Sequence, residues 1–369
     1  MKYLAALIFL LCAVPVAQAQ ELVADTVTVV RAQVLEVLVQ DTRVIPGTDT
    51  STDYQTIRVE VLEGEDTGLV LTLENDYIQL KEGEVFYARH EVNTLDGTNR
   101  YSVLSPYRLP IIVFFLLLFL ACLAIFGGLQ GIRGLIALVL SIGLIVYALL
   151  PGILAGIPPF IISVGVAGVI IIIGSYITHG INRTTSVAVV GMLVTVAITG
   201  LLAYAAVHLG RLSGFSSEEA TYLNFDTRGS IDFIGLLLGG LVIGLLGILY
   251  DAAISQAVAV EELWAMNREA TRKHVFRRAM RIGREHIGAL VNTLAIAYVG
   301  AYLPLLLLFK VSATQSFAVT INQEMFATEI LRTLVGSTGL ILAVPITTAV
   351  AVWMLHGRAT SEHSHGHSH

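Results

Sequence analysis

A succession of long apolar runs is the feature that most constrains what this chain can fold into. Seven of them have the length of a membrane span, because a hydrocarbon core about 30 Å thick takes roughly 20 helical residues. They are Ile111–Phe126, Leu135–Leu154, Phe160–Ile177, Ser186–Val207, Ile234–Tyr250, Ile287–Phe309 and Leu334–Leu355. Only 14% of the residues are charged, against about a quarter in soluble proteins. The sequence therefore predicts a membrane all-α bundle of about seven transmembrane helices over residues 109–357.

The first 19 residues have the pattern of a secretory signal peptide. Lys2 precedes the apolar stretch Leu4–Val14, and Ala17-Gln18-Ala19 offers a small-x-small cleavage site. The apolar stretch is short for a membrane span, and Pro15 interrupts it. We therefore expect cleavage before Gln20, with an uncleaved anchor as the alternative.

Residues 20–108 predict a small extracytoplasmic all-β domain, either an OB-like barrel or a sandwich. Apolar and polar residues alternate in five or six short segments bounded by turn signals. These segments lie within Thr26–Val39, Thr56–Leu62, Leu69–Leu73, Glu84–His90 and Tyr101–Leu104. Sixteen acidic and seven basic residues give the domain a net charge of −9, which excludes nucleic-acid binding because that binding needs cations to neutralise phosphates. The chain has two cysteines, Cys12 and Cys122, and neither lies in this domain, so it contains no disulfide.

The distribution of basic residues predicts the orientation of the spans. If the β-domain is translocated, seven crossings leave the C-terminus in the cytoplasm. Ten basic residues then fall in inner segments and five in outer flanks, as the positive-inside rule requires. We expect a bacterial inner-membrane protein with its N-terminal domain outside.

Seven of the inner basic residues belong to one segment, predicted as a cytoplasmic helix at about 258–286. They are Arg268, Arg272, Lys273, Arg277, Arg278, Arg281 and Arg284. Such a helix is expected to lie against anionic lipids; a gating or partner-docking helix is the alternative.

Glycines and prolines within the spans indicate how the helices pack. Gly235 with Gly239, and Gly240 with Gly244, have the small-xxx-small spacing that lets helices approach closely. Such an approach occurs either within the monomer or in a homo-oligomer. Pro304 and Pro345 are expected to kink their helices.

Asp251 is the acidic residue most expected to carry function. It follows an apolar span and precedes more apolar sequence, and an ionised carboxylate in hydrocarbon costs several kcal/mol. Ser255 lies one turn further on, and Asn292 and Thr293 are predicted at a similar depth in the next span. These four residues are candidates for a proton or cation site. The alternative is that Asp251 lies at the interface and helps to start the cytoplasmic helix, while Asn292 and Thr293 stabilise packing.

The C-terminal tail, residues 358–369, is rich in histidine. His363, His365, His367 and His369 alternate with small residues, and neutral imidazole is a good ligand for divalent metals such as zinc. Weak divalent-metal binding is one interpretation, and a tail without a role is the other. No enzyme motif such as GxSxG, a P-loop, HExxH or CxxC is present, so we expect neither an enzyme nor a bound cofactor.

Three segments carry a family resemblance. They read LLGILYDAAISQAVAVEELWAMN (Leu245–Asn267), MRIGREHIGALVNTLAIAYVGAYLPLLLLF (Met280–Phe309) and LVGSTGLILAVPITTAVA (Leu334–Ala351). In this order they resemble the YibE/F-like family of bacterial multispan membrane proteins, which implies the architecture more than the activity. More distantly, the chain is similar to the membrane core of SecD/SecF and RND transporters. That similarity implies a role in proton or sodium coupling for Asp251, with Asn292 and Thr293 as partners.

Two functions are consistent with these features. The first is an ion-coupled secondary transporter or channel-like protein of unknown substrate, in which Asp251 binds the coupling ion and the β-domain captures or gates a solute. The second is a non-transporting envelope scaffold whose β-domain binds a protein partner. Internal glycines and a polar cluster exceed what an anchor needs, which favours the transporter.

Overall fold

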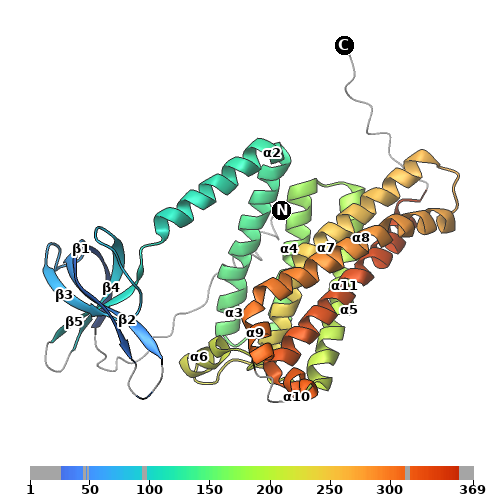
Figure 1. The fold of residues 1–369 in the computed structure, drawn as a ribbon. Coiled ribbons are helices and arrows are strands. Elements are labelled where there is room, and N and C mark those ends of the chain that lie inside the picture. The colour runs from blue at the N-terminus through green and yellow to red at the C-terminus, as the bar shows by residue number, and fades with distance from the viewer. Residues whose placement is uncertain (1–25, 45–46, 48–49, 94–97, 312–315, 357–369) are drawn as a thin grey trace, which may run out of the picture. The chain divides into compact units, whose positions relative to one another are not determined.

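The computed structural model describes residues 26–44, 47, 50–93, 98–311 and 316–356. The chain divides into two compact units, one ending at Ile125 and holding the β-sheet, the other beginning at Phe126 and helical (Figure 1). Each unit is described by itself. The expected signal peptide at 1–19 and the histidine-rich tail at 358–369 lie outside the described residues.

Five antiparallel strands form one curled sheet in the first unit. They are β1 (Thr26–Val44), β2 (Ser51–Val61), β3 (Val70–Asn75), β4 (Val85–Val92) and β5 (Asn99–Pro106). The order is β3-β2-β1-β4-β5, and the long β1 pairs with β4 through its first half and with β2 through the rest. The edge strands β3 and β5 contact each other, so the sheet is a half-barrel. The alternating pattern thus correctly predicted a small all-β domain, while the OB-like fold stays a prediction.

The inward side chains of these strands make the core of the β-unit. Val34, Ile57, Val59 and Phe86 are fully buried there. They sit at alternate strand positions because successive side chains of a strand point to opposite faces.

Helices make up the rest of the described chain. They are α2 (Leu109–Leu144), the π-helical turn η1 (Ile145–Leu149), α3 (Leu150–Leu154), α4 (Pro159–His179), α5 (Arg183–Leu209), α6 (Glu218–Asp226), α7 (Phe233–Met266), α8 (Arg272–Ala301), α9 (Leu303–Val311), α10 (Phe317–Asn322) and α11 (Glu324–Met354). All seven expected apolar runs lie on these helices, which confirms a multispan helical architecture.

The number of spans follows from helix length. Five helical stretches of the described chain can cross a membrane, and six can if α8 and α9, bent by 67°, together make one span. The first stretch, Leu109–Leu154, has 46 residues, about 69 Å at 1.5 Å per residue. It is therefore more than twice as long as a bilayer core is thick. It contains two of the expected runs and is interrupted at Gly128, whose φ of 52° and ψ of −146° are not helical. Seven crossings remain a prediction.

The prediction of one continuous basic helix at about 258–286 is wrong. Helix α7 ends at Met266, Asn267 is extended, and α8 starts at Arg272 after its N-cap Thr271. The hydroxyl of Thr271 accepts a hydrogen bond from the His274 amide at 3.3 Å, as an N-cap does. The basic residues therefore lie in a helical hairpin, in the turn and on the first half of α8.

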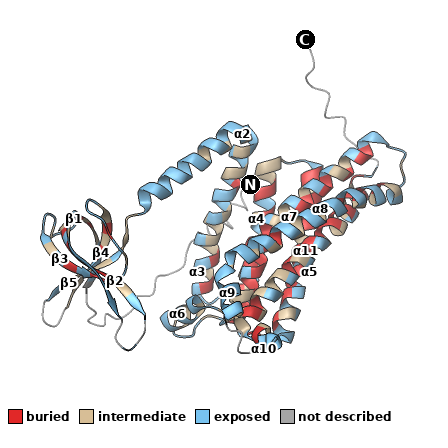
Figure 2. Cartoon of the chain, in the orientation of Figure 1, coloured by how far each residue is buried: buried red, intermediate tan, exposed pale blue. Residues whose placement is uncertain are grey.

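Helices α5, α7 and α11 form the centre of the helical unit. Helix α11 packs against α5, α7 and α8, and α7 also packs against α4. Figure 2 shows the buried residues gathered where these helices face one another, whereas α2 is almost wholly exposed. Two glycines allow α5 and α11 to approach closely. A Cβ added at Gly191 would lie 2.5 Å from the Thr347 hydroxyl oxygen, and one at Gly339 would lie 2.5 Å from that of Thr199.

The glycines of α7 divide into two sets. A Cβ at Gly239 would collide with the Ser163 hydroxyl oxygen of α4, and one at Gly235 would lie 3.3 Å from Pro159. This pair serves packing within the monomer. Gly240 and Gly244 have no atom within 4 Å of an added Cβ, and a homo-oligomer through this face stays a prediction.

Candidate functional site

Asp251 lies in the middle of α7, on an exposed face of this helix. Gly240, Gly244, Gly247, Asp251 and Ser255 are exposed and follow one another at spacings of three or four residues. This spacing places them on one side of the helix. Asp251 therefore does not start a new helix, because α7 continues for 15 residues beyond it.

The end of α4 supplies a titratable neighbour of Asp251 from another helix. His179, the last residue of α4, interacts electrostatically with the Asp251 carboxylate. The imidazole ring also lies 5.7 Å from the ring of Tyr250, whose hydroxyl donates to the Gly174 carbonyl at 3.1 Å. The sequence had indicated no partner for His179, since the two segments lie far apart along the chain.

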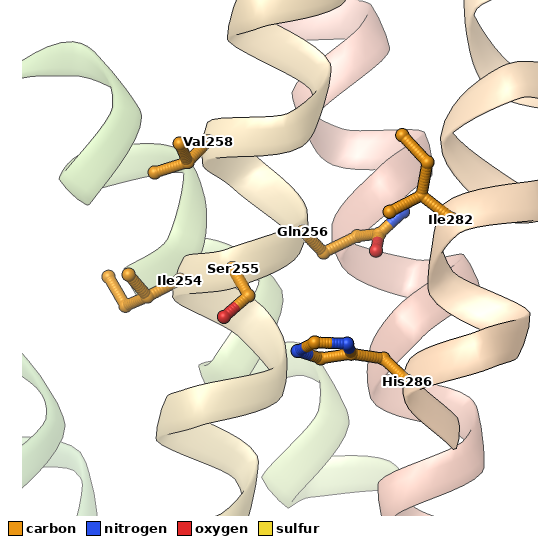
Figure 3. A pocket seen from close by; sticks show the side chains of 6 residues that line it. All are labelled: Ile254, Ser255, Gln256, Val258, Ile282 and His286. Atoms are coloured by element: carbon orange, nitrogen blue, oxygen red, sulfur yellow. The ribbon is translucent and has the colours of Figure 1, made fainter. Parts of the chain in front are cut away.

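Ser255 faces a pocket between α7 and α8. The pocket has a volume of about 380 Å³ and is lined by Ile254, Ser255, Gln256, Val258, Ile282 and His286. Figure 3 shows Ser255 and His286 reaching from the two helices toward the same space. His286 was not among the predicted site residues.

Asn292 and Thr293 lie on the exposed side of α8. The Thr293 hydroxyl donates to the Ala289 carbonyl of its own helix at 3.0 Å. Within the described residues, neither side chain makes a hydrogen bond to Asp251. The four-residue cluster that the sequence suggested is thus not assembled by direct contacts, and its role in ion binding stays a prediction.

Gln256 ties three helices together behind the Ser255 pocket. Its buried amide nitrogen donates to the Ala279 carbonyl of α8 at 2.9 Å and to the Thr348 hydroxyl of α11 at 2.8 Å. Gly283 makes room for it, because a Cβ there would lie 2.9 Å from the Gln256 amide oxygen.

A second and larger cavity lies where α8 bends into α9. Its volume is about 430 Å³. Its polar lining residues are Tyr298, Tyr302, Glu329 and Thr333, and its aromatic side includes Phe309, Phe317 and Phe326. Tyr302 stands at the break between the two helices. Pro304 is the second residue of α9, so the predicted kink occurs there, whereas α11 continues as a helix through Pro345.

Glu329 and Arg332 form an ion pair beside this cavity, one turn apart on α11. Arg332 Nη2 lies 3.5 Å from Glu329 Oε1, and the side chains are only 25% and 15% exposed, respectively. Arg332 Nη1 also donates to the Tyr302 hydroxyl at 3.4 Å. Two atoms of the pair, Glu329 Oε2 and Arg332 Nε, are buried without a hydrogen-bond partner in the described structure.

The sequence pattern did not predict this pair. Arg332 is one of the five basic residues expected in outer flanks, and Glu329 is not among the predicted site residues. The available signal was the Glu-x-x-Arg spacing just before the last apolar run. Placing an ion pair inside a membrane bundle costs desolvation free energy, so such a pair indicates a functional site.

Metal binding has no support in the described residues, where no three His, Cys, Asp or Glu side chains form a group that could hold an ion. The four histidines of the tail lie outside them.

Comparisons with known proteins address the identity of the chain as a whole. No curated protein and no solved structure shows significant similarity to it. The family model described as YibE/F-like protein matches residues 115–357. Since this match covers more than half of the 369 residues, the chain belongs to the YibE/F-like family.

Proposed function

We propose that this multispan membrane protein is an ion-coupled secondary transporter whose solute site is the cavity between the α8–α9 bend and α11. The observation that carries the proposal is the half-buried Glu329–Arg332 pair, of which Glu329 lines that cavity. Ionisable residues inside membrane bundles mark substrate or ion pathways, and helices that break at a cavity are a recurrent feature of transporter binding sites. An anchor or scaffold would have no need for either.

Asp251 is the second group of the proposal, as the site that binds and releases the coupling proton or cation. It is exposed on α7, next to His179. A carboxylate on an uncovered face of a long apolar helix is stabilised by contact with water or a cation. The glycines before it leave space on that face.

Cation flux into proteoliposomes tests both groups. The full chain is reconstituted with a pH-sensitive dye inside, and a potassium diffusion potential is imposed in the presence of sodium, lithium or protons alone. The wild type should show protein-dependent flux, which Asp251→Asn and Glu329→Gln should each lower at least tenfold. Glu285→Gln, an exposed carboxylate on α8, is the matched control and should behave as the wild type. Normal flux in both variants would contradict the proposal, and no flux in the wild type would favour the scaffold.

The proposed topology has seven crossings, with the β-unit outside and the C-terminus in the cytoplasm of a bacterial inner membrane. It requires Leu109–Leu154 to cross twice, turning near Gly128. A cysteine introduced at Arg133 should then be labelled only from the cytoplasmic side, after Cys122 has been replaced by Ser. Labelling from the outer side would refute the double crossing.

The α7–α8 hairpin is the proposed contact with anionic lipids. Arg272, Lys273, Arg277, Arg278, Arg281 and Arg284 are all exposed at the start of α8. Each such cation contributes about 1 kcal/mol near an anionic surface. Phosphatidylglycerol should raise the melting temperature of the detergent-solubilised protein more than phosphatidylcholine does, and replacing Arg277 and Arg281 by Gln should reduce this difference.

A further inference from the structure

The cavity at the α8–α9 bend combines an aromatic wall with a single charged group. Tyr298, Tyr302, Phe309, Phe317 and Phe326 all line it. Among the described residues that line it, Glu329 is the one charged side chain, and none of them is Lys, Arg or His. The volume of about 430 Å³ lies within the range of small-molecule sites, roughly 300 to 1,000 Å³.

The Glu329 carboxylate interacts with two side chains, Arg332 and Tyr302. Oε1 lies 3.5 Å from Arg332 Nη2, and the carboxylate also interacts with the Tyr302 hydroxyl, while Oε2 is buried and makes no closer hydrogen bond in the described structure. A buried acceptor without a full hydrogen bond is unfavourable. A ligand that brings an N–H donor to this carboxylate would reduce that cost.

Arg332 does not offer its own unpaired atom to a ligand. Its side chain lines a different void, formed with α5 and α7, of only about 10 Å³. Such a void holds one water molecule at most. The two residues of the ion pair therefore differ. Glu329 holds the unpaired acceptor and lines the ligand-sized cavity, whereas Arg332 holds the unpaired donor and lines a void too small for a ligand.

From this asymmetry we infer that the cavity binds a lipophilic organic cation, an amine with an aromatic or branched apolar body. The ammonium group donates to the Glu329 carboxylate, and the apolar body packs against the aromatic wall. Aromatic faces attract cations as well. An anionic ligand would meet the carboxylate and is disfavoured. This inference deepens the proposed transport function. The claim that the cation is transported rests on that proposal, whereas the claim that the cavity binds the cation is tested by binding alone.

Binding of three matched probes to the full chain in lipid nanodiscs tests the inference. The probes are 1-naphthylmethylamine, 1-naphthalenemethanol and 1-naphthoate, which share one ring system and differ in charge. Titration calorimetry, with empty nanodiscs subtracted for partitioning, should show the amine binding at least tenfold more tightly than the alcohol and the naphthoate not binding. Equal affinity for amine and alcohol would overturn the inference and indicate a site for neutral apolar groups such as lipid chains.

Glu329→Gln should weaken amine binding about 10- to 100-fold, because a hydrogen bond to a charged group is lost. It should leave the affinity for the alcohol unchanged. Glu285→Gln should leave both affinities at their wild-type values. An unchanged amine affinity in Glu329→Gln would overturn the inference.

If Glu329→Gln does not fold, as judged by gel filtration, Val299→Trp takes its place. Val299 lines the cavity and is half exposed, so an indole there fills the space without removing an ion-pair partner. It should abolish amine binding, and retained binding would place the amine elsewhere. Amine binding without amine uptake into proteoliposomes would refute transport of the amine and support the binding site. Cation flux without amine binding would support the transporter and refute the binding site.

Discussion

The close approach of α5 to α11 makes a quantitative prediction for Gly191→Ala. The new Cβ would lie 2.5 Å from the Thr347 hydroxyl oxygen, 3.0 Å from its Cβ and 3.1 Å from its Cα. The last of these atoms belongs to the backbone, so a rotamer change of Thr347 cannot relieve the clash and the helices must separate. Such overpacking costs about 1 to 3 kcal/mol, against about 1 kcal/mol that alanine returns in helix propensity. We expect Gly191→Ala to lower the free energy of unfolding by up to about 2 kcal/mol.

The matched control is Gly165→Ala on α4, where an added Cβ has no atom within 4 Å. It should leave the stability unchanged or raise it by up to about 1 kcal/mol. The measurement is unfolding of the detergent-solubilised full chain by increasing dodecyl sulfate, followed by circular dichroism.

A second substitution separates the side-chain clash from the backbone clash. Thr347→Ala removes the hydroxyl, which is buried without a partner, so alone it should cost little. Combined with Gly191→Ala it should recover about half of the loss, because the clash with the remaining side-chain carbon and the backbone at position 347 persists. If Gly191→Ala proved as stable as Gly165→Ala, the close packing of α5 on α11 would be refuted.

Two further predictions concern single polar contacts. The Tyr101 hydroxyl donates to Asp66, and burial first, then this bond, raise the pKa of Tyr101 above its ordinary value near 10. The bond thus stabilises the β-unit below pH 10 and is lost as pH rises through the folded-state pKa. Above pH 10, hydrogen exchange of the β5 peptide should therefore become faster than the intrinsic effect of pH explains. This extra increase should occur in the wild type and in the control Tyr77→Phe, but not in Tyr101→Phe. Gln256→Leu removes two bonds, one of them to Thr348, and should lower the free energy of unfolding by about 1 to 3 kcal/mol; an unchanged dodecyl sulfate midpoint would show that the bonds contribute nothing.

Local patterns predicted the elements well where one kind of residue dominates a segment. The alternation in Thr56–Leu62 became β2, and the apolar run Phe160–Ile177 became α4, because the period and the length of an apolar pattern are set by the segment's own residues. The turn between α7 and α8 was missed for a related reason. Arg268 in the turn and the basic residues of α8 follow one another at helical spacing, and they conceal the cap signal of Thr271.

The cavity at the α8–α9 bend depends on contacts that a single sequence does not display. Tyr302 and Arg332 lie 30 residues apart and meet only because the chain turns back through α10. In the sequence Glu329 does not differ from other acidic residues, and only the fold brings Arg332 and Tyr302 next to it. Within the described residues no hydrogen bond joins Asp251 to Asn292, because a similar depth along two helices does not determine which face each residue occupies. Their joint role in ion binding stays a prediction.

The two carboxylates of the proposed transporter lie at different depths in the bundle. Leu245 of α7 packs against Gly336 of α11, and the two helices run in the same direction, since Gln256 meets Thr348 further along both. Asp251 is six residues beyond this level and Glu329 seven residues before it, which separates them by about 20 Å along the bundle axis at 1.5 Å per residue. At that distance two unit charges interact by less than about 1 kcal/mol at an effective dielectric constant of 20. Direct electrostatics is therefore too weak to make ion binding at one carboxylate control a ligand at the other. Transport that needs both groups requires a rearrangement of α7 against α11.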